Sequence, residues 1–262
     1  MNKAIVSLSG GLDSAVCLAW AVDHYGADNV YAVGFNYGQK HDLETKQAEE
    51  IANYYEVPFR VFDVCSIFEE SNASLMKNST LELKKESYEQ QIKESDTGIV
   101  NSYIPFRNGV FLSIITSYAI QKGANIVVLG AHAEDSVKDS SKISAAYPDT
   151  SQEFMNYMSD AINSGSGRQV TCIAPLLVLN KSQVLSLGIN GDVDGIERKP
   201  FPYWLTWSCY TPEFRNGKYY PCNACATCLD REVAFKNNNL TDIMKYMGLN
   251  NNLTNIMKYM GL

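Results

Sequence analysis

The sequence has no excess of positive charge and no long hydrophobic run. It carries 22 lysines and arginines against 29 aspartates and glutamates, which gives a formal net charge of −7. This balance disfavours a nucleic-acid-binding surface, which is usually basic, so a small-molecule substrate is expected. No apolar run approaches the roughly 20 residues that span a bilayer. The chain also enters a predicted core strand at residue 3, without a signal or transit peptide. A cytoplasmic protein that binds neither nucleic acid nor membrane is expected.

The Walker pattern G-x-x-x-x-G-K-[ST] is absent as well, which excludes the usual cradle for β- and γ-phosphates. In its place, Ser9-Gly10-Gly11-Leu12-Asp13-Ser14 lies between two apolar segments. The segment at 3–8 predicts a buried strand, and the segment at 15–22 predicts a helix. A glycine turn between strand and helix brings backbone N–H groups and the positive end of the helix dipole to one point. The loop therefore predicts an anion site; the alternative is an ordinary tight turn.

Strand-like and helix-like segments alternate along the rest of the chain. Further strands are predicted at 29–35, 59–64, 125–130 and 170–176, and helices at 43–55, 108–115 and 229–235. This alternation predicts an α/β fold with a doubly wound, mostly parallel sheet, which binds ligands at the carboxyl ends of its strands. Ser, Asn, Lys and Glu dominate the segment at about 66–102, which is expected to be a polar insertion, either a lid or disordered.

Seven cysteines in a cytosolic chain indicate metal binding or catalysis rather than disulfides. Cys17, Cys65 and Cys172 lie in apolar stretches and are expected to be packed thiols. The other four cluster near the end of the chain: Cys209, Cys222, Cys225 and Cys228. Four thiolates with no open position predict a structural zinc site. The alternatives are an iron–sulfur cluster and a disulfide pair.

The chain ends in a near-exact tandem repeat. Residues 237–249 and 250–262 differ only by Asp242 in the first copy and Asn255 in the second. Each copy has a threonine suited to helix capping, a short apolar helix pattern and a glycine stop. Two copies are too few for a solenoid. The second copy is expected to be dispensable; the alternative is a helix that binds a partner.

Several motifs carry a family resemblance, and they occur in a fixed order. They are Ser9-Gly10-Gly11-Leu12-Asp13-Ser14, Phe35-Asn36-Tyr37-Gly38-Gln39-Lys40-His41, Pro105-Phe106-Arg107-Asn108, Gly130-Ala131-His132-Ala133-Glu134-Asp135, Ala146-Tyr147-Pro148-Asp149, and Leu205-Thr206-Trp207-Ser208-Cys209-Tyr210 with the cysteine triplet after it. Together they resemble the 7-cyano-7-deazaguanine synthase family of the PP-loop ATP pyrophosphatase superfamily. The match covers residues 3–235.

The resemblance implies an adenine nucleotide alpha hydrolase-like fold with a small zinc-binding subdomain. On this basis we expect an ATP-binding domain at 1–200, a four-cysteine zinc region at 201–236 and a duplicated helical tail at 237–262. It also implies a homodimer that uses ATP, Mg²⁺ and a structural Zn²⁺. The implied reaction converts 7-carboxy-7-deazaguanine and ammonia to 7-cyano-7-deazaguanine, for queuosine or other 7-deazaguanine biosynthesis.

Chemistry explains why such a reaction needs a pyrophosphate-holding loop. A carboxylate is a poor acylating agent because its leaving group would be oxide. Attack on the α-phosphorus of ATP makes an acyl-adenylate, from which ammonia displaces AMP to give an amide. A second adenylation, on the amide oxygen, then allows elimination to the nitrile. Positioning and charge stabilisation supply most of the catalysis in such chemistry.

The resemblance also implies a role for individual residues. The expected ATP site comprises Leu8, Ser9, Gly10, Gly11, Leu12, Asp13, Ser14, Phe35 and Gly130. The expected catalytic residues are Asp13, Arg107 and Lys181. The expected substrate site comprises Arg107, Asn108, Tyr147 and Asp149, with Phe35 and Tyr147 flanking a base.

Alternative roles remain open for four of these side chains. Asp13 either ligates Mg²⁺ or positions the loop. Arg107 grips a phosphate or the substrate carboxylate, or forms a surface salt bridge. Lys181 reaches the ATP phosphates or is a solvated lysine at a helix start. Asp149 accepts hydrogen bonds from a guanine-like base or is a turn residue after Pro148.

The sequence departs from the family pattern in places, which leaves rival functions open. Thr150 stands where the family usually has cysteine, and insertions occur at 136–145 and around 191–203. A related enzyme that stops at the amide or uses another amine is one alternative. A tRNA-modifying PP-loop enzyme is another, which the acidic balance disfavours. A non-catalytic ATP-binding sensor is a third, against which Asp13, Arg107 and Lys181 argue.

Overall fold

A five-stranded parallel sheet forms the centre of the protein, whose computed structural model describes residues 2–132 and 146–247. The strands are β1 (Ala4–Ser7), β2 (Val30–Asn36), β3 (Phe59–Asp63), β4 (Ile126–Val128) and β5 (Thr171–Ile173). Their order is β3-β2-β1-β4-β5, and every pairing is parallel. The chain therefore winds outward from β1 in both directions, which confirms the predicted doubly wound sheet.

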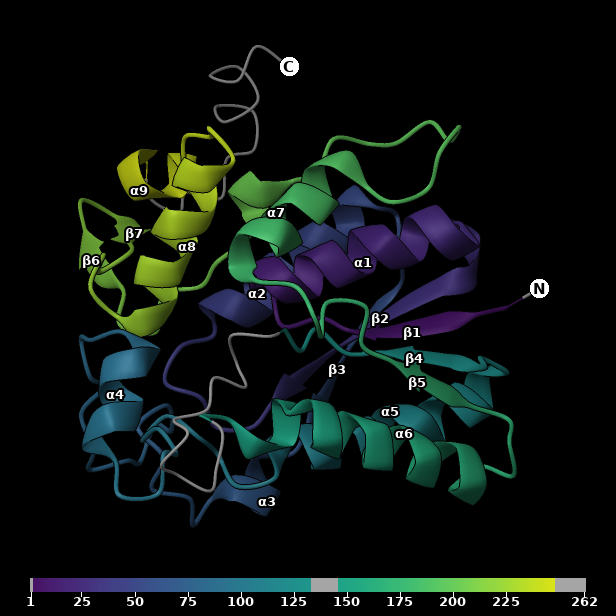
Figure 1. Ribbon diagram of the computed structural model, residues 1–262, viewed down its shortest axis with the longest axis horizontal. Coiled ribbons are helices and arrows are strands. Elements are labelled where there is room, and N and C mark those ends of the chain that lie inside the picture. Colours follow the sequence, from purple (N-terminus) through teal and green to yellow (C-terminus); the bar gives the residue numbers. More distant parts are fainter. Residues whose placement is uncertain (1, 133–145, 248–262) are drawn as a thin grey trace.

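Helices cover both faces of this sheet (Figure 1). One layer contains α1 (Leu12–Tyr25), α2 (Leu43–Tyr54) and α7 (Lys181–Asn190), and the opposite layer contains α5 (Arg107–Lys122) and α6 (Gln152–Gly165). Side chains alternate along β1 as strand geometry requires. Ala4 and Val6 join the core beneath α1, whereas Ile5 joins the core against α5. Both faces of the central strand are therefore buried, as in other parallel sheets.

The polar segment at 66–102 is folded. It begins within α3 (Cys65–Phe68) and contains α4 (Tyr88–Glu94). Met76 is 1% exposed and Ile92 is 2% exposed. Of the two expected alternatives, disorder is therefore excluded. The segment is built around a few well-buried apolar anchors, which its polar composition hides.

The four-cysteine region forms a small unit beside α2 and α4 (Figure 1). It comprises an antiparallel hairpin of β6 (Glu213–Arg215) and β7 (Lys218–Tyr220), followed by α8 (Ala226–Asn237) and α9 (Ile243–Met247). Short 3-10 turns complete the fold at Ala27–Asn29, Pro148–Thr150 and Tyr203–Leu205. None of the helices in the described ranges has the length and apolarity to cross a membrane.

The first copy of the terminal repeat is packed against the body of the protein. Ile243 and Met244 are buried, and Leu240 packs on the core beneath α1. Asp242 accepts hydrogen bonds from the guanidinium of Arg231 at 2.6 and 3.0 Å. The second copy, residues 250–262, lies outside the described residues. The insertion expected at 136–145 also lies outside them.

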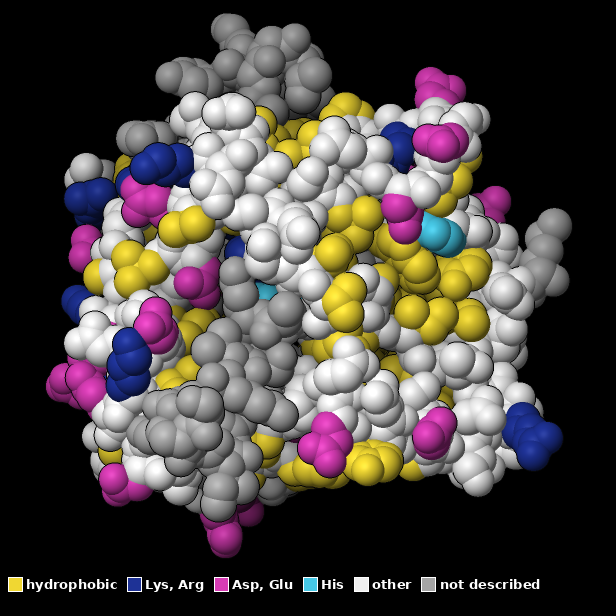
Figure 2. All heavy atoms as spheres, viewed as in Figure 1, with side chains coloured by type: hydrophobic (Ala, Val, Ile, Leu, Met, Phe, Trp, Pro, Cys, Tyr) yellow, Lys and Arg dark blue, Asp and Glu magenta, His cyan; other side chains and the backbone are white. Residues whose placement is uncertain are grey.

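The face of the protein drawn in Figure 2 carries side chains of both charge signs. Figure 2 shows acidic and basic side chains intermingled on one face, and the part drawn in colour has no continuous basic area there. An apolar area lies over α1.

Candidate functional site

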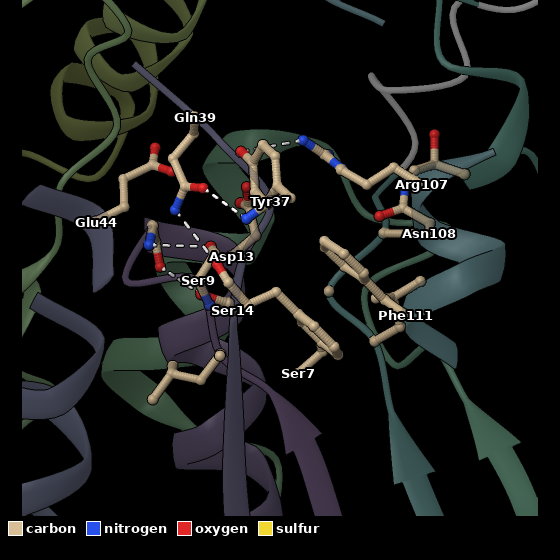
Figure 3. Close-up of a pocket in the computed structure, with 18 of the residues that line it drawn as sticks. Ser7, Ser9, Asp13, Ser14, Tyr37, Gln39, Glu44, Arg107, Asn108 and Phe111 are labelled. Carbon is tan, nitrogen blue, oxygen red and sulfur yellow. Dashed lines mark hydrogen bonds between the residues drawn. The ribbon is translucent and has the colours of Figure 1, made fainter. Parts of the chain in front are cut away.

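A cavity opens at the carboxyl ends of β1, β2 and β4, where the strand order reverses (Figure 3). This is the position at which doubly wound sheets bind ligands. The loop after β1 contributes Ser9, Gly11, Asp13 and Ser14 to its wall. Other walls come from β2, α2, α5 and the segment after β4, and they include Phe35, Glu44, Arg107, Phe111 and Gly130.

Hydrogen bonds within the loop at 9–14 hold its shape. The backbone N–H of Ser9 donates to Oγ of Ser14 at 3.1 Å, and that hydroxyl donates to the carbonyl of Gly11 at 3.0 Å. Gly10 has a φ of 92°, and a Cβ there would lie 2.0 Å from the backbone oxygen of Glu44. Glycine therefore allows the loop to lie directly against the first turn of α2.

The expected ATP-site residues divide into those that line the cavity and those that support it. Leu8, Phe35 and Gly130 line it together with most of the loop. Gly10 and Leu12 are not among the lining residues: Gly10 faces α2, and the Leu12 side chain is fully buried in the core.

Asp13 and Lys181 form a close ion pair at the base of the loop. Lys181 Nζ lies 2.7 Å from Oδ1 and 2.5 Å from Oδ2 of Asp13. Lys181 is 7% exposed, which rules out the solvated alternative. A capping box of Asn180 and Gln183 fixes it at the start of α7. His132 Nε2 lies 3.4 Å from Lys181 Nζ and 3.6 Å from Asp13 Oδ2, so three charged or polar groups meet here.

Charge attraction controls the protonation of Asp13. Burial by itself would raise the pKa of this carboxyl group, but Lys181 and His132 oppose burial, and the pKa lies below its ordinary value. The Asp13 carboxylate is therefore ionised and already has a cation on both oxygens. Of the two roles expected for it, positioning of the loop and of Lys181 fits this geometry; the role of Mg²⁺ ligand stays a prediction.

Arg107 is the first residue of α5 and faces the loop across the cavity (Figure 3). Its Nη1 donates to the Tyr37 hydroxyl at 3.4 Å, and its guanidinium lies 5.3 Å from the centre of the Tyr37 ring and 5.8 Å from that of Phe111. Among the described residues, no acidic side chain forms an ion pair with it. The surface salt bridge alternative therefore has no counterpart here.

Asp149 is buried beside the start of α5. Its Oδ2 accepts a hydrogen bond from the backbone N–H of Asn108 at 2.8 Å, so it supports the helix start that carries Arg107. Its Oδ1 is buried and has no hydrogen-bond donor within the described ranges. Burial raises the pKa of Asp149, and Arg107 opposes that rise. Asp149 does not line the cavity, whereas Asn108 and Tyr147 do.

Several residues of the cavity had no predicted role. Glu44 and Tyr210 line it, but neither received a role. Burial raises the pKa of Glu44 to about 7, against the opposing charge of Arg107. His132 was missed although it lies within the motif Gly130 to Asp135. Tyr210 directly follows Cys209 of the four-cysteine cluster, and this adjacency was the available signal.

The four clustered cysteines converge as their spacing predicts. The sulfur atoms of Cys209, Cys222, Cys225 and Cys228 all lie within 4.8 Å of one another. Zinc–sulfur bonds of about 2.3 Å in a tetrahedron place sulfur atoms about 3.8 Å apart, so the donor set fits one such ion. The backbone N–H of Trp207 donates to the carbonyl of Gly10 at 2.9 Å, which fixes this region to the loop at 9–14.

The Ser-Gly-Gly-x-Asp-Ser loop at the switch point of a doubly wound sheet defines an α/β protein of the PP-loop class. Residues 3–239 match the family described as "Queuosine biosynthesis protein QueC". The chain is 33% identical over 249 residues to a 7-cyano-7-deazaguanine synthase of Oceanobacillus iheyensis, covering 94% of this chain and 99% of that protein. A synthase of the same name from Thermoplasma volcanium is also 33% identical, with 94% and 91% covered. This chain belongs to the QueC family, which confirms the resemblance.

Proposed function

We propose that this protein converts 7-carboxy-7-deazaguanine and ammonia to 7-cyano-7-deazaguanine, with cleavage of ATP to AMP and pyrophosphate. The observation that carries the proposal is that the loop at 9–14 and the Arg107 guanidinium lie on opposite walls of one cavity. The loop at 9–14 forms one wall, and its Asp13 is paired with the buried Lys181; the Arg107 guanidinium faces the loop from the other wall. The relatives that bear the name of this enzyme support the same activity.

The loop would hold the β,γ-pyrophosphate of ATP. Backbone N–H groups of the loop offer donors, and α1 begins there with its positive dipole end. Lys181 supplies the fixed positive charge that a departing pyrophosphate needs. Asp13 keeps that ammonium in place. Mg²⁺ would accompany the phosphates of ATP and offset their charge, and we assign it no protein ligand.

Arg107 would hold the carboxylate of the substrate in line with the α-phosphorus. A guanidinium suits this task because it binds a carboxylate through two parallel hydrogen bonds. Phe35 is stacked on Phe111 with ring centres 3.9 Å apart, and Tyr147 also lines the cavity. These aromatic side chains form the apolar surface against which we place the deazaguanine base, with Asn108 on the same cavity wall.

The steps that follow would run through acyl-adenylate and amide intermediates. One carboxylate oxygen attacks the α-phosphorus and pyrophosphate leaves. Ammonia then displaces AMP to give the amide, whose oxygen attacks a second ATP. Loss of this second AMP, with two protons from nitrogen, leaves the nitrile. The four cysteines would hold one structural Zn²⁺, and the protein would act as a cytoplasmic homodimer on a small molecule rather than on tRNA.

Product analysis tests this proposal directly. The protein is incubated with 7-carboxy-7-deazaguanine, ATP, Mg²⁺ and ammonium, and the products are resolved by chromatography and mass spectrometry. We expect the nitrile, AMP and pyrophosphate. Accumulation of the amide alone would favour the related enzyme that stops there, and ADP as the main nucleotide product would refute the pyrophosphatase chemistry.

A further inference from the structure

Phe106 has a backbone conformation that phenylalanine rarely adopts, and it comes directly before Arg107. Its φ is 57° and its ψ is 23°, in the left-handed region. This conformation brings Cβ close to the following carbonyl oxygen, so a bulky residue there is a true outlier. Strain of this kind persists only where the surrounding structure enforces it, and such residues cluster at functional sites.

Contacts on both sides of Phe106 enforce its conformation. Its backbone N–H donates to the Tyr103 hydroxyl at 2.9 Å. Its carbonyl accepts a hydrogen bond from the N–H of Val110 at 3.1 Å, which belongs to α5. Its ring meets the edge of the Phe154 ring, with centres 5.7 Å apart. The backbone and the side chain of Phe106 are therefore both held in place.

The Phe106 ring also lies directly on Gly109, in the first turn of α5. A Cβ built on Gly109 would come within 2.4, 2.6 and 2.8 Å of three carbons of that ring. Gly109 lies inside a helix, where glycine is less favourable than alanine, and its φ is not positive. The backbone at this position therefore does not need glycine. The ring of Phe106 does, because only glycine leaves room for it.

These contacts give α5 a fixed starting point, and Arg107 is its first residue. Asp149 holds the next peptide group, since its Oδ2 accepts a hydrogen bond from the N–H of Asn108 at 2.8 Å. Arg107 faces the loop at 9–14 across the cavity (Figure 3), whereas Phe106 is not among the described residues that line it. Phe106 can therefore act on the cavity only through its neighbour.

We propose that Phe106 is a positioning residue for Arg107. Its ring, packed on Gly109, keeps the backbone left-handed and so keeps the guanidinium on the cavity wall before the substrate arrives. This inference rests on the proposed function, in which Arg107 binds the substrate carboxylate. A side chain that is already in place loses little conformational freedom on binding, which strengthens binding. The effect is therefore expected in KM for the 7-carboxy compound.

Two substitutions of Phe106 separate its backbone conformation from the packing of its ring. Phe106→Ala removes the ring but keeps a Cβ, so the chain should leave the left-handed region and KM for the 7-carboxy compound should rise about tenfold. Phe106→Gly also removes the ring, but glycine adopts a positive φ without strain, so we expect a rise of about threefold or less. KM for ATP should stay within about twofold in both, because its proposed site is the loop on the opposite wall.

The order of these two variants decides between positioning and simple packing. If the ring only contributed apolar contacts, glycine would be at least as harmful as alanine, because it removes more apolar surface. KM values that are equal in the two variants, or higher in Phe106→Gly, would overturn the proposal. KM is the chosen readout because a partly unfolded sample lowers the apparent kcat and leaves KM unchanged.

Gly109→Ala tests the same contact from the other side. The new methyl group should displace the Phe106 ring, which is 53% exposed and can swing into solvent. Alanine favours the helix, so the melting temperature should not fall although KM for the 7-carboxy compound rises. In Phe106→Ala/Gly109→Ala the ring is already gone, so KM should match that of Phe106→Ala alone. Increases in KM that multiply would overturn the link between the two residues.

Arg168→Gly and Gly165→Ala are the matched controls. Arg168 is an exposed residue with a φ of 65°, and a Cβ on Gly165 in α6 would meet nothing within 4 Å. Neither residue lines the cavity, so both variants should keep the KM of wild type for the 7-carboxy compound. A raised KM in either control would mean that a change of backbone strain or a new helical methyl group acts without Arg107, which would overturn the proposal.

Wild-type protein and Arg107→Ala distinguish this inference from the function beneath it. Wild-type protein that forms no nitrile, or Arg107→Ala protein with an unchanged KM for the 7-carboxy compound, would refute the proposed function or its use of Arg107. Nitrile formation with a raised KM in Arg107→Ala, but with the KM of wild type in Phe106→Ala, would leave that function standing and overturn this inference alone.

Discussion

The Lys181 ammonium contacts both oxygens of the Asp13 carboxylate, at 2.7 and 2.5 Å, across 168 residues of sequence. The contact joins the first turn of α1, where Asp13 lines the cavity, to the first residue of α7. The Lys181 ammonium is therefore already held in place beside Asp13 of the loop at 9–14. The position of this ammonium group is set by the fold and not by a bound ligand.

The first prediction concerns this ion pair. Asp13→Ala should lower the free energy of unfolding by about 3 kcal/mol, because it leaves a buried ammonium without its main counter-charge. It should also abolish turnover. Asp13→Asn keeps the shape and a hydrogen-bond acceptor, so it should cost less stability while still abolishing turnover. Urea unfolding and AMP release measure the two effects.

The pH dependence of stability provides a check on the same pair. The folded pKa of Asp13 lies below its ordinary value of 3.8, so its contribution is present above that value and is lost as the pH falls through the folded pKa. The stability gap between wild type and Asp13→Asn should therefore close below about pH 4. A gap that stays constant down to the acid limit would argue against the ion pair as its source.

The second prediction concerns the metal. We expect one zinc per chain, bound by the four clustered cysteines. Cys222→Ala should lower zinc content, solubility and melting temperature, since a remnant of three thiolates leaves ion and loop unsatisfied. Cys65→Ala is the control, because Cys65 lies outside the cluster and should keep the full zinc content. Elemental analysis decides the matter, and iron with visible absorbance would contradict it.

The third prediction concerns Glu44. Its folded pKa of about 7 exceeds its ordinary value of 4.5, chiefly through burial, so the native state holds its proton more tightly than the unfolded state. Stability should thus fall as the pH rises from about 4.5 to 7. Glu44→Gln should remove this loss and gain on the order of 2 kcal/mol at pH 8, with no gain at pH 4.

Zinc-loaded protein is required for this measurement, because the Cys225 thiolate also raises the pKa of Glu44 and a bound metal would reduce that effect. Glu49→Gln, an exposed position on the same helix, is the matched control and should show no such gain. A Glu44→Gln protein with the same stability profile as wild type at both pH values would refute the prediction.

The fold was predictable wherever a local pattern decides it. Runs such as Ala4–Ser7 and Ile126–Val128 are short, apolar and rich in branched residues, and both are buried strands of the sheet. The loop at 9–14 and the cysteine spacing were equally local signals. The segment at 66–102 was not, since its buried anchors are irregularly spaced and find their partners only in the tertiary structure.

For the site residues, too, local sequence signals identified candidates but not the contacts that these residues make. Lys181 and Asp13 were each recognised as candidates, but their contact joins positions 168 residues apart and has no signature in either neighbourhood. Gly10 was expected to meet a ligand, yet its missing side chain makes room for α2. Tyr210 lies in a recognised motif, but the cavity that it lines is assembled from residues far away in sequence.

The last prediction concerns the terminal duplication. A chain that ends at Leu249 should keep its activity, zinc and stability to within about 1 kcal/mol, the scale of an ordinary surface change. The first copy already supplies the contacts: Leu240, Ile243 and Met244 pack inward, and Asp242 holds the buried Arg231. Calorimetry, zinc analysis and turnover of the truncated protein measure the three properties.

The single difference between the two copies provides the matched control. Asp242→Asn makes the first copy identical to the second and removes the charge that faces Arg231, which is only 6% exposed. Breaking a buried pair in this way costs about 3 kcal/mol, so we expect a clear fall in melting temperature. Asn255→Asp makes the reciprocal change and should have no effect. If instead truncation at Leu249 destabilises the protein or lowers its oligomeric state in solution, the second copy is a docking element, and its duplication is functional rather than incidental.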